Sequence, residues 1–538
     1  MFDVIIKNGK VIDGAGNPWF KADVGIDGQK ISAIGRLSAE KASKIIDADG
    51  LAVSPGFIDM HSHSDFELLV NPKAESKIRQ GITTEVIGNC GESAAPLNDL
   101  MKAETRKTDS LIEEAELQLD WSTMKDYLNK LGRQGVAVNV VPLVGHGNLR
   151  VYTMGFVDSP PTKTELEEMK KRLAQAMEEG AFGISTGLIY PPGCYAETDE
   201  LIELSGVVAS YGGIYTSHIR DEGDKMLESV KEAIGIGGEA GIPVEISHHK
   251  AEGKVNWGKV KESLKMIEEV RDRGIDVTCD VYPYVAASTV LSAELPHWAH
   301  EGGTEKLVQR LTDAETRARL IREMREESPD QASMLEVDIW DVTQIARCKN
   351  HPNLEGKTVS EIAQTKHMDA FELVFDLLIE DAAISIVGFH MCEDDVCTVL
   401  RHPVSMIGTD ASAVAPYGVL GKGKPHPRSY GTFPRVLGKY VREERILTLE
   451  NAIRKMTSLP AQKLGLRDRG IIREGMRADI TIFNPETITD RATYQNPHQY
   501  PDGVEYVIVN GKIAVGERGH TGVLAGGVLL PREVPAGS

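Results

Sequence analysis

Long apolar runs and an excess of basic charge are both absent from this sequence of 538 residues. No stretch approaches the roughly 18 consecutive apolar residues that cross a bilayer, which excludes a membrane-spanning protein. The 80 acidic residues outnumber the 60 basic ones, and the net charge of −20 argues against nucleic acid or an anionic membrane face as a partner. Hydrophobic residues still make up 41% of the chain, which is enough for a sizeable core.

Cysteine is also scarce. Six cysteines in so long a chain are too few for a disulfide framework, so we expect a reducing, cytoplasmic location in which each thiol is available for metal binding or chemistry. The first residues, MFDVIIKNGKVIDG, lack the basic patch, apolar stretch and small-residue cleavage site of a secretory signal. We therefore expect them to be part of the folded structure.

Both ends of the chain have the pattern of β-strands. Apolar residues around Asn8-Gly9 and Asp27-Gly28 predict two hairpins in the first fifty residues, and residues 504–515 predict another. We infer one small β-domain built from residues 1–54 and 470–538. Its tail from Gly522 onward is rich in Gly and Pro and is expected to be loosely held.

The middle of the chain, residues 55–469, alternates strand-like and helix-like segments. The strand candidates are residues 56–63, 83–90, 136–145, 180–188, 213–219, 243–249, 275–282 and 404–410. Strands that alternate with helices predict an α/β fold with a parallel sheet, and eight of them favour a closed (β/α)8 barrel over a doubly wound open sheet. The long gap after the seventh strand predicts a helical insertion at about 285–400.

Ionisable side chains stand at the ends of five of these strands. They are His61 and His63, Cys90, His218, His248 with His249, and Asp410. In a parallel barrel all carboxyl ends open on one face, and residues i and i+2 of a strand point the same way. Imidazole, thiolate and carboxylate gathered there would suit zinc or a similar divalent ion.

Each of these residues also has a structural interpretation. A lone histidine is usually a satisfied structural residue, Cys90 alone is a small buried hydrophobe, and Asp410 is able to cap the next helix. The coincidence at five strand ends favours the metal site. His249 points away from His248 and is expected to be structural, and His402 and His426 are weaker candidates for the metal.

Several blocks of the chain together resemble the N-acyl-D-amino-acid deacylases (D-aminoacylases) of the amidohydrolase superfamily. The blocks are PGFIDMHSHSD (55–65), VIGNCGES (86–93), STGLIYPPG (185–193), SHIRDE (217–222), EISHHK (245–250), DVYPY (280–284) and HPRSYGTFPRVL (426–437), with the terminal blocks 3–14 and 473–483. The resemblance covers nearly the whole chain. It implies a TIM barrel with a small β-sandwich, zinc, and hydrolysis of N-acylated D-amino acids.

The resemblance also implies the metal ligands. Cys90, His218 and His248 would form a tight zinc site, and His61, His63 and Asp410 a weaker second one with Cys90 as a bridge. Many two-metal relatives bridge instead with a carboxylated lysine on the fourth strand. This chain has no lysine between Lys171 and Lys225, which favours the deacylase branch over the cyclic-amide branch.

By the same resemblance, Asp410 is the general base and acid, and Tyr190 donates a hydrogen bond to the developing oxyanion unless it is only a packing residue. Lys250, Tyr282 and Arg428 are the candidates for binding the substrate's α-carboxylate. The guanidinium fork makes Arg428 the stronger one, although it is also able to pair with an acid of the insertion.

The substrate's side chain is less well defined by the sequence. Trp298 is a candidate wall of its pocket, and no single cation stands out in residues 293–303, which favours apolar or neutral D-amino acids. The alternative functions are a cyclic-amide or dipeptide hydrolase of the same superfamily (dihydroorotase, hydantoinase or isoaspartyl-dipeptidase type) and a non-catalytic scaffold relative. The oligomeric state is not indicated.

Overall fold

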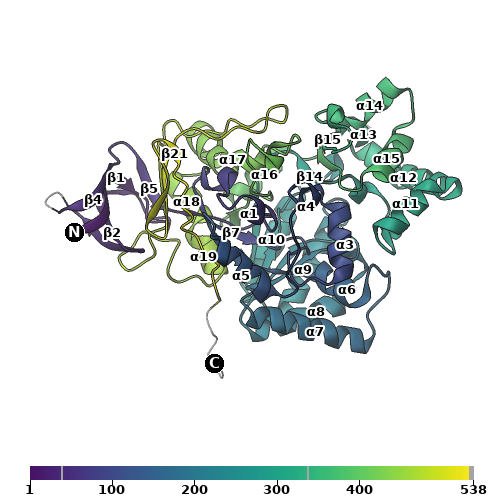
Figure 1. Ribbon diagram of the computed structural model, residues 1–538, viewed down its shortest axis with the longest axis horizontal. Coiled ribbons are helices and arrows are strands. Elements are labelled where there is room, and N and C mark those ends of the chain that lie inside the picture. Colours follow the sequence, from purple (N-terminus) through teal and green to yellow (C-terminus); the bar gives the residue numbers. More distant parts are fainter. Residues whose placement is uncertain (38–39, 336–338, 532–538) are drawn as a thin grey trace.

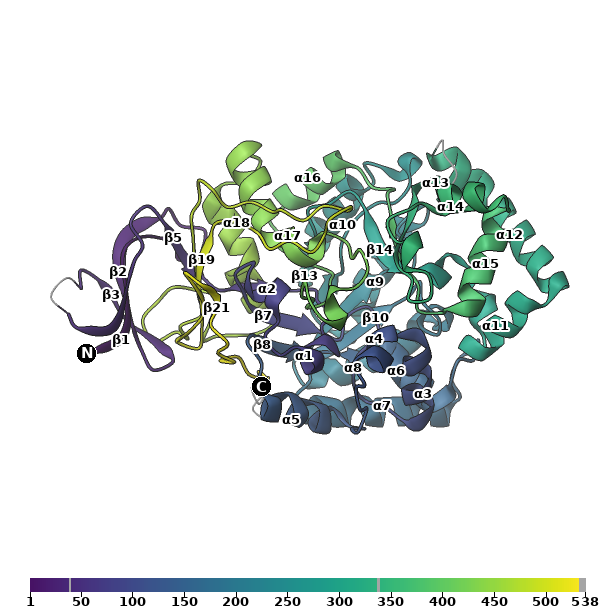
Figure 2. The same cartoon turned by 45° about the horizontal axis from the view of Figure 1, so that its top comes forward.

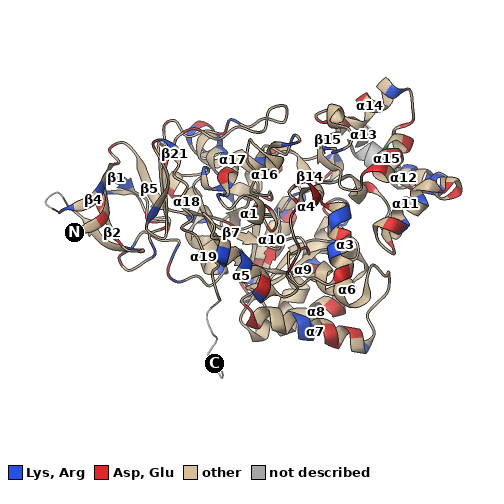
Figure 3. Ribbon diagram, in the orientation of Figure 1, with Lys and Arg blue, Asp and Glu red and all other residues tan. Residues whose placement is uncertain are grey.

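The computed structural model describes residues 1–37, 40–335 and 339–531 (Figure 1). A β-sheet from the two chain termini lies at one end, parallel strands with surrounding helices form the middle, and a mainly helical segment projects at the other end (Figure 2). Charged residues are concentrated on peripheral helices, among them α3 (Asp99–Thr108) and α7 (Lys163–Glu178), as Figure 3 shows. In the described part of the chain, none of the helices has the length and apolar character needed to cross a membrane.

The terminal sheet has nine strands in the order β21-β20-β19-β18-β5-β1-β2-β3, with β4 paired to β1. The N-terminal strands are β1 (Phe2–Val11), β2 (Phe20–Asp27), β3 (Lys30–Gly35), β4 (Ala42–Asp47) and β5 (Ala52–Pro55). The C-terminal strands are β18 (Ile480–Phe483), β19 (Val504–Val509), β20 (Lys512–Gly516) and β21 (Gly519–His520). The predicted turns at Asp27-Gly28 and Asn510-Gly511 are confirmed.

The turn predicted at Asn8-Gly9 is wrong, because β1 continues through both residues. Its register shifts between Ile6 and Gly9, and Asn8 has a φ of 63°, so the pair forms a bulge within one strand. The neighbouring strand β5 favours this conformation. A Cβ on Gly9 would lie 2.5 Å from Val53 Cγ2, so glycine is needed for the close approach of β5.

The expectation of a loosely held tail is also wrong for residues 526–529. Backbone bonds run from Gly526 N to Val136 O, from Val140 N to Gly527 O and from Leu529 N to Val140 O. The tail therefore lies along β8 (Asn139–Pro142) as an added extended segment, and these bonds hold its backbone despite its glycines. Residues 532–538 lie outside the described residues.

Each of the eight strand segments predicted for the middle of the chain contains a strand, residues 136–145 contain two (β8 and β9), and paired neighbours run parallel. One sheet has the order β6-β7-β8 and another the order β17-β13-β12-β11-β10-β9. Besides β8 the strands are β6 (Phe57–Asp59), β7 (Ile82–Ile87), β9 (Val144–Gly145), β10 (Gly183–Gly187), β11 (Ile214–His218), β12 (Val244–Ile246), β13 (Val277–Val281) and β17 (Ser405–Ile407). Backbone bonds from Phe182 N to Pro142 O and from Asp410 N to His61 O join the two sheets at both edges.

Helices lie between successive strands. They are α1 (Glu67–Val70), α2 (Glu75–Ile78), α4 (Ser110–Glu114), α5 (Met124–Gln134), α6 (His146–Met154), α8 (Thr198–Ser210), α9 (Met226–Ala240), α10 (Val260–Arg271) and α16 (Glu393–Arg401), together with α3 and α7. Helices α17 (Arg428–Arg435), α18 (Leu449–Met456) and α19 (Ser458–Lys463) follow β17, the last of the parallel strands. Thr162 and Glu165 form a capping box that starts α7, whose residues Met169, Leu173 and Met177 are buried at helical spacing.

The sequence led us to expect a helical insertion, but the insertion is only partly helical. It contains helices α11 (Thr304–Thr312), α12 (Ala314–Leu335), α13 (Ile339–Val342), α14 (Val359–Lys366) and α15 (Ala370–Glu380). It also contains an antiparallel sheet of β14 (Ala287–Val290), β16 (Ser385–Gly388) and β15 (Thr343–Arg347). These strands have only four or five residues and pair over long separations, so helical periodicity dominates the local pattern. The insertion has its own hydrophobic core around Trp340 and Phe375.

Candidate metal centre

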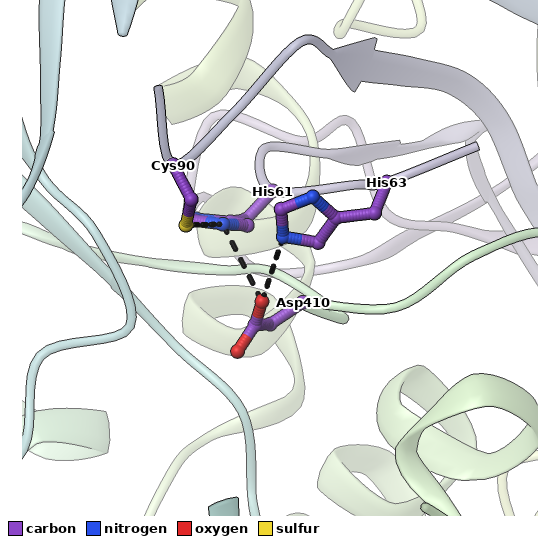
Figure 4. A group of neighbouring side chains, drawn as sticks. All are labelled: His61, His63, Cys90 and Asp410. Atoms are coloured by element: carbon purple, nitrogen blue, oxygen red, sulfur yellow. Dashed lines mark hydrogen bonds and ion pairs between the residues drawn. The ribbon is translucent and has the colours of Figure 1, made fainter. Parts of the chain in front are cut away.

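Side chains from three strand ends meet in one cluster, the Asp410 group. His61 and His63 follow β6, Cys90 follows β7 and Asp410 follows β17 (Figure 4). His61 Nε2 lies 3.2 Å from Cys90 Sγ, and His63 Nε2 lies 3.0 Å from Asp410 Oδ1. One ligand atom of each of the four residues lies within 4.8 Å of the others, a spacing that a single metal ion can span.

Cys90 also belongs to a second cluster, the His218 group, with His218 and His248. Cys90 Sγ lies 3.5 Å from His248 Nε2, and the rings of His218 and His248 are 4.3 Å apart between centroids. Both ring nitrogens of His218 are buried without a hydrogen-bond partner among the described residues. Buried polar atoms without a partner are costly, and a thiolate with two imidazoles is a ligand set that zinc prefers, so these residues fit a zinc ion.

The backbone is in the left-handed region at three of these ligands. Cys90, His248 and Asp410 have φ values of 53°, 33° and 49°. Such conformations cost about 1–3 kcal/mol each for a residue other than glycine and persist where the surroundings enforce them. At Cys90 the approach of β10 contributes, since a Cβ on Gly187 would lie 2.1 Å from the Cys90 carbonyl oxygen. The strained positions are thus three residues that follow strand ends and whose side chains belong to the two clusters.

Two buried carboxylates that we did not predict as site residues contact the histidines of the two groups. Asp280 Oδ2 lies 3.2 Å from His61 Nδ1, and Asp280 Oδ1 accepts a 3.0 Å hydrogen bond from His248 N. Glu222 Oε1 lies 3.0 Å from His248 Nδ1. Glu222 lies in the sequence block SHIRDE and Asp280 in the block DVYPY. For Asp280 the available signal was a polar residue on an otherwise apolar strand.

A buried lysine, also not predicted, ties the strand ends together beneath the Asp410 group. Lys77 on α2 is fully buried, and its Nζ donates to Asp59 Oδ2 at 2.7 Å, Thr409 Oγ1 at 2.7 Å and the Ala411 carbonyl at 2.7 Å. Glu85 Oε2 lies 3.4 Å from the same ammonium. The lysine therefore bridges β6, β7 and the loop that carries Asp410.

Opposing effects set the protonation of the acidic ligands. Burial raises the pKa of the Cys90 thiol, but the nearby His61 and His248 outweigh it and hold that pKa well below its usual value. Burial likewise raises the pKa of Asp410, and the charges of Arg428, His248 and His61 outweigh it and hold that pKa well below the ordinary value. Asp410 is therefore anionic at neutral pH, and the surroundings of Cys90 favour its thiolate, the form of cysteine that binds a metal.

The residues predicted to bind the substrate's carboxylate lie beside the two groups. Arg428 Nη1 lies 2.7 Å from Asp410 Oδ2, so the alternative of a pair with an acid of the insertion is wrong. Lys250 Nζ lies 2.6 Å from Glu222, and the guanidinium of Arg428 stacks over the Tyr282 ring at 4.7 Å from its centroid. Both cations are thus paired with carboxylates of the site itself.

Tyr190 lies against the His218 group rather than in a distant packing position. Its ring meets the His218 ring edge-on at 5.0 Å between centroids, and its hydroxyl lies 2.9 Å from Thr289 Oγ1. Burial, together with the charge of Cys90, raises the pKa of Tyr190 well above its usual value. The phenol therefore keeps its proton at neutral pH and remains a hydrogen-bond donor.

The weaker candidates lie elsewhere. His249 Nε2 lies 2.8 Å from Ser263 Oγ, His402 Nε2 lies 3.0 Å from Glu268, and His426 Nε2 lies 3.0 Å from the Ala286 carbonyl. None of the three belongs to either ligand group in the described part of the chain. Trp298 packs within the insertion, where its indole donates to Glu323.

Comparison with known proteins gives concordant results. Residues 44–515 match the amidohydrolase family. An N-acyl-D-glutamate deacylase of Alcaligenes xylosoxydans xylosoxydans is 39% identical over 95% of this chain and 93% of its own, and a D-aminoacylase of the same organism is 37% identical over 98% and 97%. Among solved structures, an N-acyl-D-glutamate deacylase from Bordetella bronchiseptica superposes with a TM-score of 0.83 at 34% identity, covering 99% of this chain and 100% of that one. It was solved with zinc and a phosphonate inhibitor that mimics the tetrahedral intermediate.

Proposed function

The chain belongs to the amidohydrolase family, and from this premise we propose that it is a zinc-dependent N-acyl-D-amino-acid deacylase. It hydrolyses the amide bond of N-acyl-D-amino acids and releases a carboxylate and a free D-amino acid. The observation that carries the proposal is the convergence of Cys90, His218 and His248, with neither nitrogen of His218 in a hydrogen bond among the described residues.

The His218 group is proposed to hold the tighter zinc ion. His61, His63 and Asp410 are proposed to hold a second ion, with Cys90 shared between the two sites; the membership of Cys90 in both groups supports this. Zinc held by these residues would supply Lewis acidity, which would lower the pKa of water toward about 7 and polarise the amide carbonyl.

The protein's own residues are proposed to move the protons. Asp410 accepts the proton of the attacking water and returns it to the departing amine nitrogen. Its low pKa supports this role, because the carboxylate is free of a proton at neutral pH. The Tyr190 phenol donates a hydrogen bond to the oxygen on which negative charge develops, a contribution that is typically about 2.7–4 kcal/mol of the barrier.

Lys250, Tyr282 and Arg428 are proposed to bind the α-carboxylate of the substrate, a small-molecule N-acyl amino acid. Two buried cations beside the Tyr282 ring support this, because their positive charge is concentrated at one place where it can attract an anion. The excess of acidic residues over the whole chain does not oppose anion binding at such a local pair.

For the architecture, we propose a closed (β/α)8 barrel at residues 55–469, a small β-sandwich from residues 1–54 and 470–538, and an insertion near 285–400. The backbone bond from Asp410 N to His61 O supports closure, since it joins the last parallel strand to the first. We further propose a cytoplasmic location, which the six free cysteines support.

The test is an assay of the purified zinc-loaded protein with N-acetyl-D-methionine, N-acetyl-D-leucine and N-acetyl-D-glutamate, their L-isomers, hydantoin and dihydroorotate. We expect release of D-amino acids, with at most slow cleavage of the L-isomers. Ring opening of hydantoin or dihydroorotate without deacylation would replace the proposal by a cyclic-amide hydrolase. Less than about half an equivalent of bound zinc with no activity after zinc addition would instead favour a scaffold protein.

A further inference from the structure

Glu222 lies where the His218 group meets the candidate substrate cations. It follows β11 by four residues, and the backbone bond from Glu252 N to Glu222 O, 2.8 Å long, holds its segment against the loop that follows β12. Its carboxylate is buried, and it lies 3.0 Å from His248 Nδ1 and 2.6 Å from Lys250 Nζ. His218 Nε2 lies 3.5 Å from the same carboxylate.

The contact with His248 determines which of its ring nitrogens is free. A neutral histidine that offers Nε2 to a metal carries its proton on Nδ1 and needs a hydrogen-bond acceptor there. Lys250 Nζ also lies 3.0 Å from Nδ1, but an ammonium has no acceptor. Glu222 is therefore the acceptor that leaves His248 Nε2 directed toward Cys90, 3.5 Å away.

The contact with Lys250 holds a second functional group. An ammonium carries three donor hydrogens. Glu222 lies 2.6 Å and the His248 carbonyl 3.3 Å from the Lys250 ammonium, so these two acceptors fix where the charge stands. Without a carboxylate between them, the ammonium of Lys250 and the two histidine rings would face one another uncompensated.

We propose that Glu222 is a positioning residue that couples metal binding to substrate binding, because one carboxylate orients His248 for zinc and Lys250 for the substrate's carboxylate. The substrate half rests on the proposed function; the metal half does not. The proposal predicts that one substitution weakens two measurable equilibria that involve different ligands.

The test compares three variants. Glu222→Gln keeps the size of the side chain but removes the charge. Lys250→Met removes only the lysine. Glu232→Gln is the matched control, because Glu232 is also paired with a cation, Arg220, at 2.9 Å, on the outer helix α9. Zinc affinity is measured by competition with a chromophoric chelator, and KM for N-acetyl-D-methionine is measured on fully zinc-loaded protein.

Glu222→Gln is expected to lose about 10- to 100-fold in zinc affinity, as is typical for a partner of a metal-bound histidine. Its KM is expected to rise about tenfold or more. Lys250→Met is expected to raise KM and leave zinc affinity unchanged, and Glu232→Gln is expected to change neither. If Glu222→Gln does not fold, the same measurements are made on Glu222→Asp, whose shorter carboxylate should retain the lysine pair and lose the contact with His248.

Wild-type zinc affinity in a folded Glu222→Gln protein, or a wild-type KM in its zinc-loaded form, would overturn the proposal. A different result would overturn only the proposed function: a wild-type protein that deacylates none of the substrates while Glu222→Gln still loses zinc affinity. In that case the positioning of His248 would remain supported.

Discussion

Replacement of Lys77 by methionine tests whether one buried charge stabilises the strand ends that carry His61, His63 and Asp410. Lys77 is fully buried and bridges Asp59, Thr409 and the Ala411 carbonyl. Methionine has a similar volume, so the variant leaves little cavity and mainly removes the ammonium. Asp59 and Glu85, which are also fully buried, would then lack their shared cation.

The expected loss follows from this burial. Removal of one partner from a buried ion pair leaves an uncompensated charge and costs about 3–5 kcal/mol in free energy of unfolding. Lys170→Met is the matched control, since Lys170 pairs with Glu203 at 2.6 Å while 22% of its side chain and 55% of the Glu203 side chain are exposed. A surface pair of this kind contributes about 0–1 kcal/mol.

The assay is urea unfolding of metal-free protein at pH 7, because bound zinc would add its own stabilisation. Hydrogen exchange of the amides at residues 59–62 and 409–411 reports on the strand ends directly, since a large chain need not unfold in one step. We expect faster exchange there in Lys77→Met and not in Lys170→Met. A loss below about 1 kcal/mol in Lys77→Met, with unchanged exchange, would refute the reasoning.

Three further predictions concern the catalytic groups. Asp410→Asn should keep zinc in the His218 group but lower turnover at least about 10²-fold, measured by elemental analysis and initial rates; near-normal turnover would place the base elsewhere. Burial raises the pKa of Asp410 and Arg428 lowers it, so Arg428→Met should raise that pKa and move the acid limb of the kcat/KM profile to higher pH, since the base must be ionised to act. An acid limb that does not move would contradict this. Cys90→Ser should lose zinc from both groups because its sulfur belongs to both, whereas His63→Asn should keep about one equivalent, and equal zinc content in the two variants would disprove the shared role.

The eight parallel strands and the ligand types at their ends were predictable from the sequence, because both are local features. A short buried strand is a run of apolar residues, and His61, Cys90 or Asp410 at its end interrupts that run visibly. The helices of the middle region show the same locality, as the buried periodic residues of α7 illustrate.

The errors occurred where a distant segment decides a local conformation. Asn8-Gly9 has the composition of a hairpin turn, yet β5 packs against it and makes it a bulge. The tail after Gly522 has the composition of a loose end, but the backbone at Val136 and Val140 supplies hydrogen-bond partners to its residues 526–529.

The residues missed at the site act through contacts that composition does not reveal. Asp280 lies 219 positions from His61, and Lys77 lies 332 positions from Thr409. A lone lysine or aspartate in a sequence has the same appearance whether it is solvated or buried. Glu222 is closer to its partners along the chain, yet only the folded loop directs its carboxylate to both His248 and Lys250.

The amino-acid order by itself thus determined the alternation of strands and helices and the chemical kind of the ligands, since side-chain type and hydrophobic period are properties of neighbouring residues. The tertiary structure alone decided which of these side chains lie together, that Cys90 belongs to both groups, and which buried charges contact them. The physical reason is that the cost of an unpaired buried charge or an unfilled hydrogen bond depends on what the fold brings into contact.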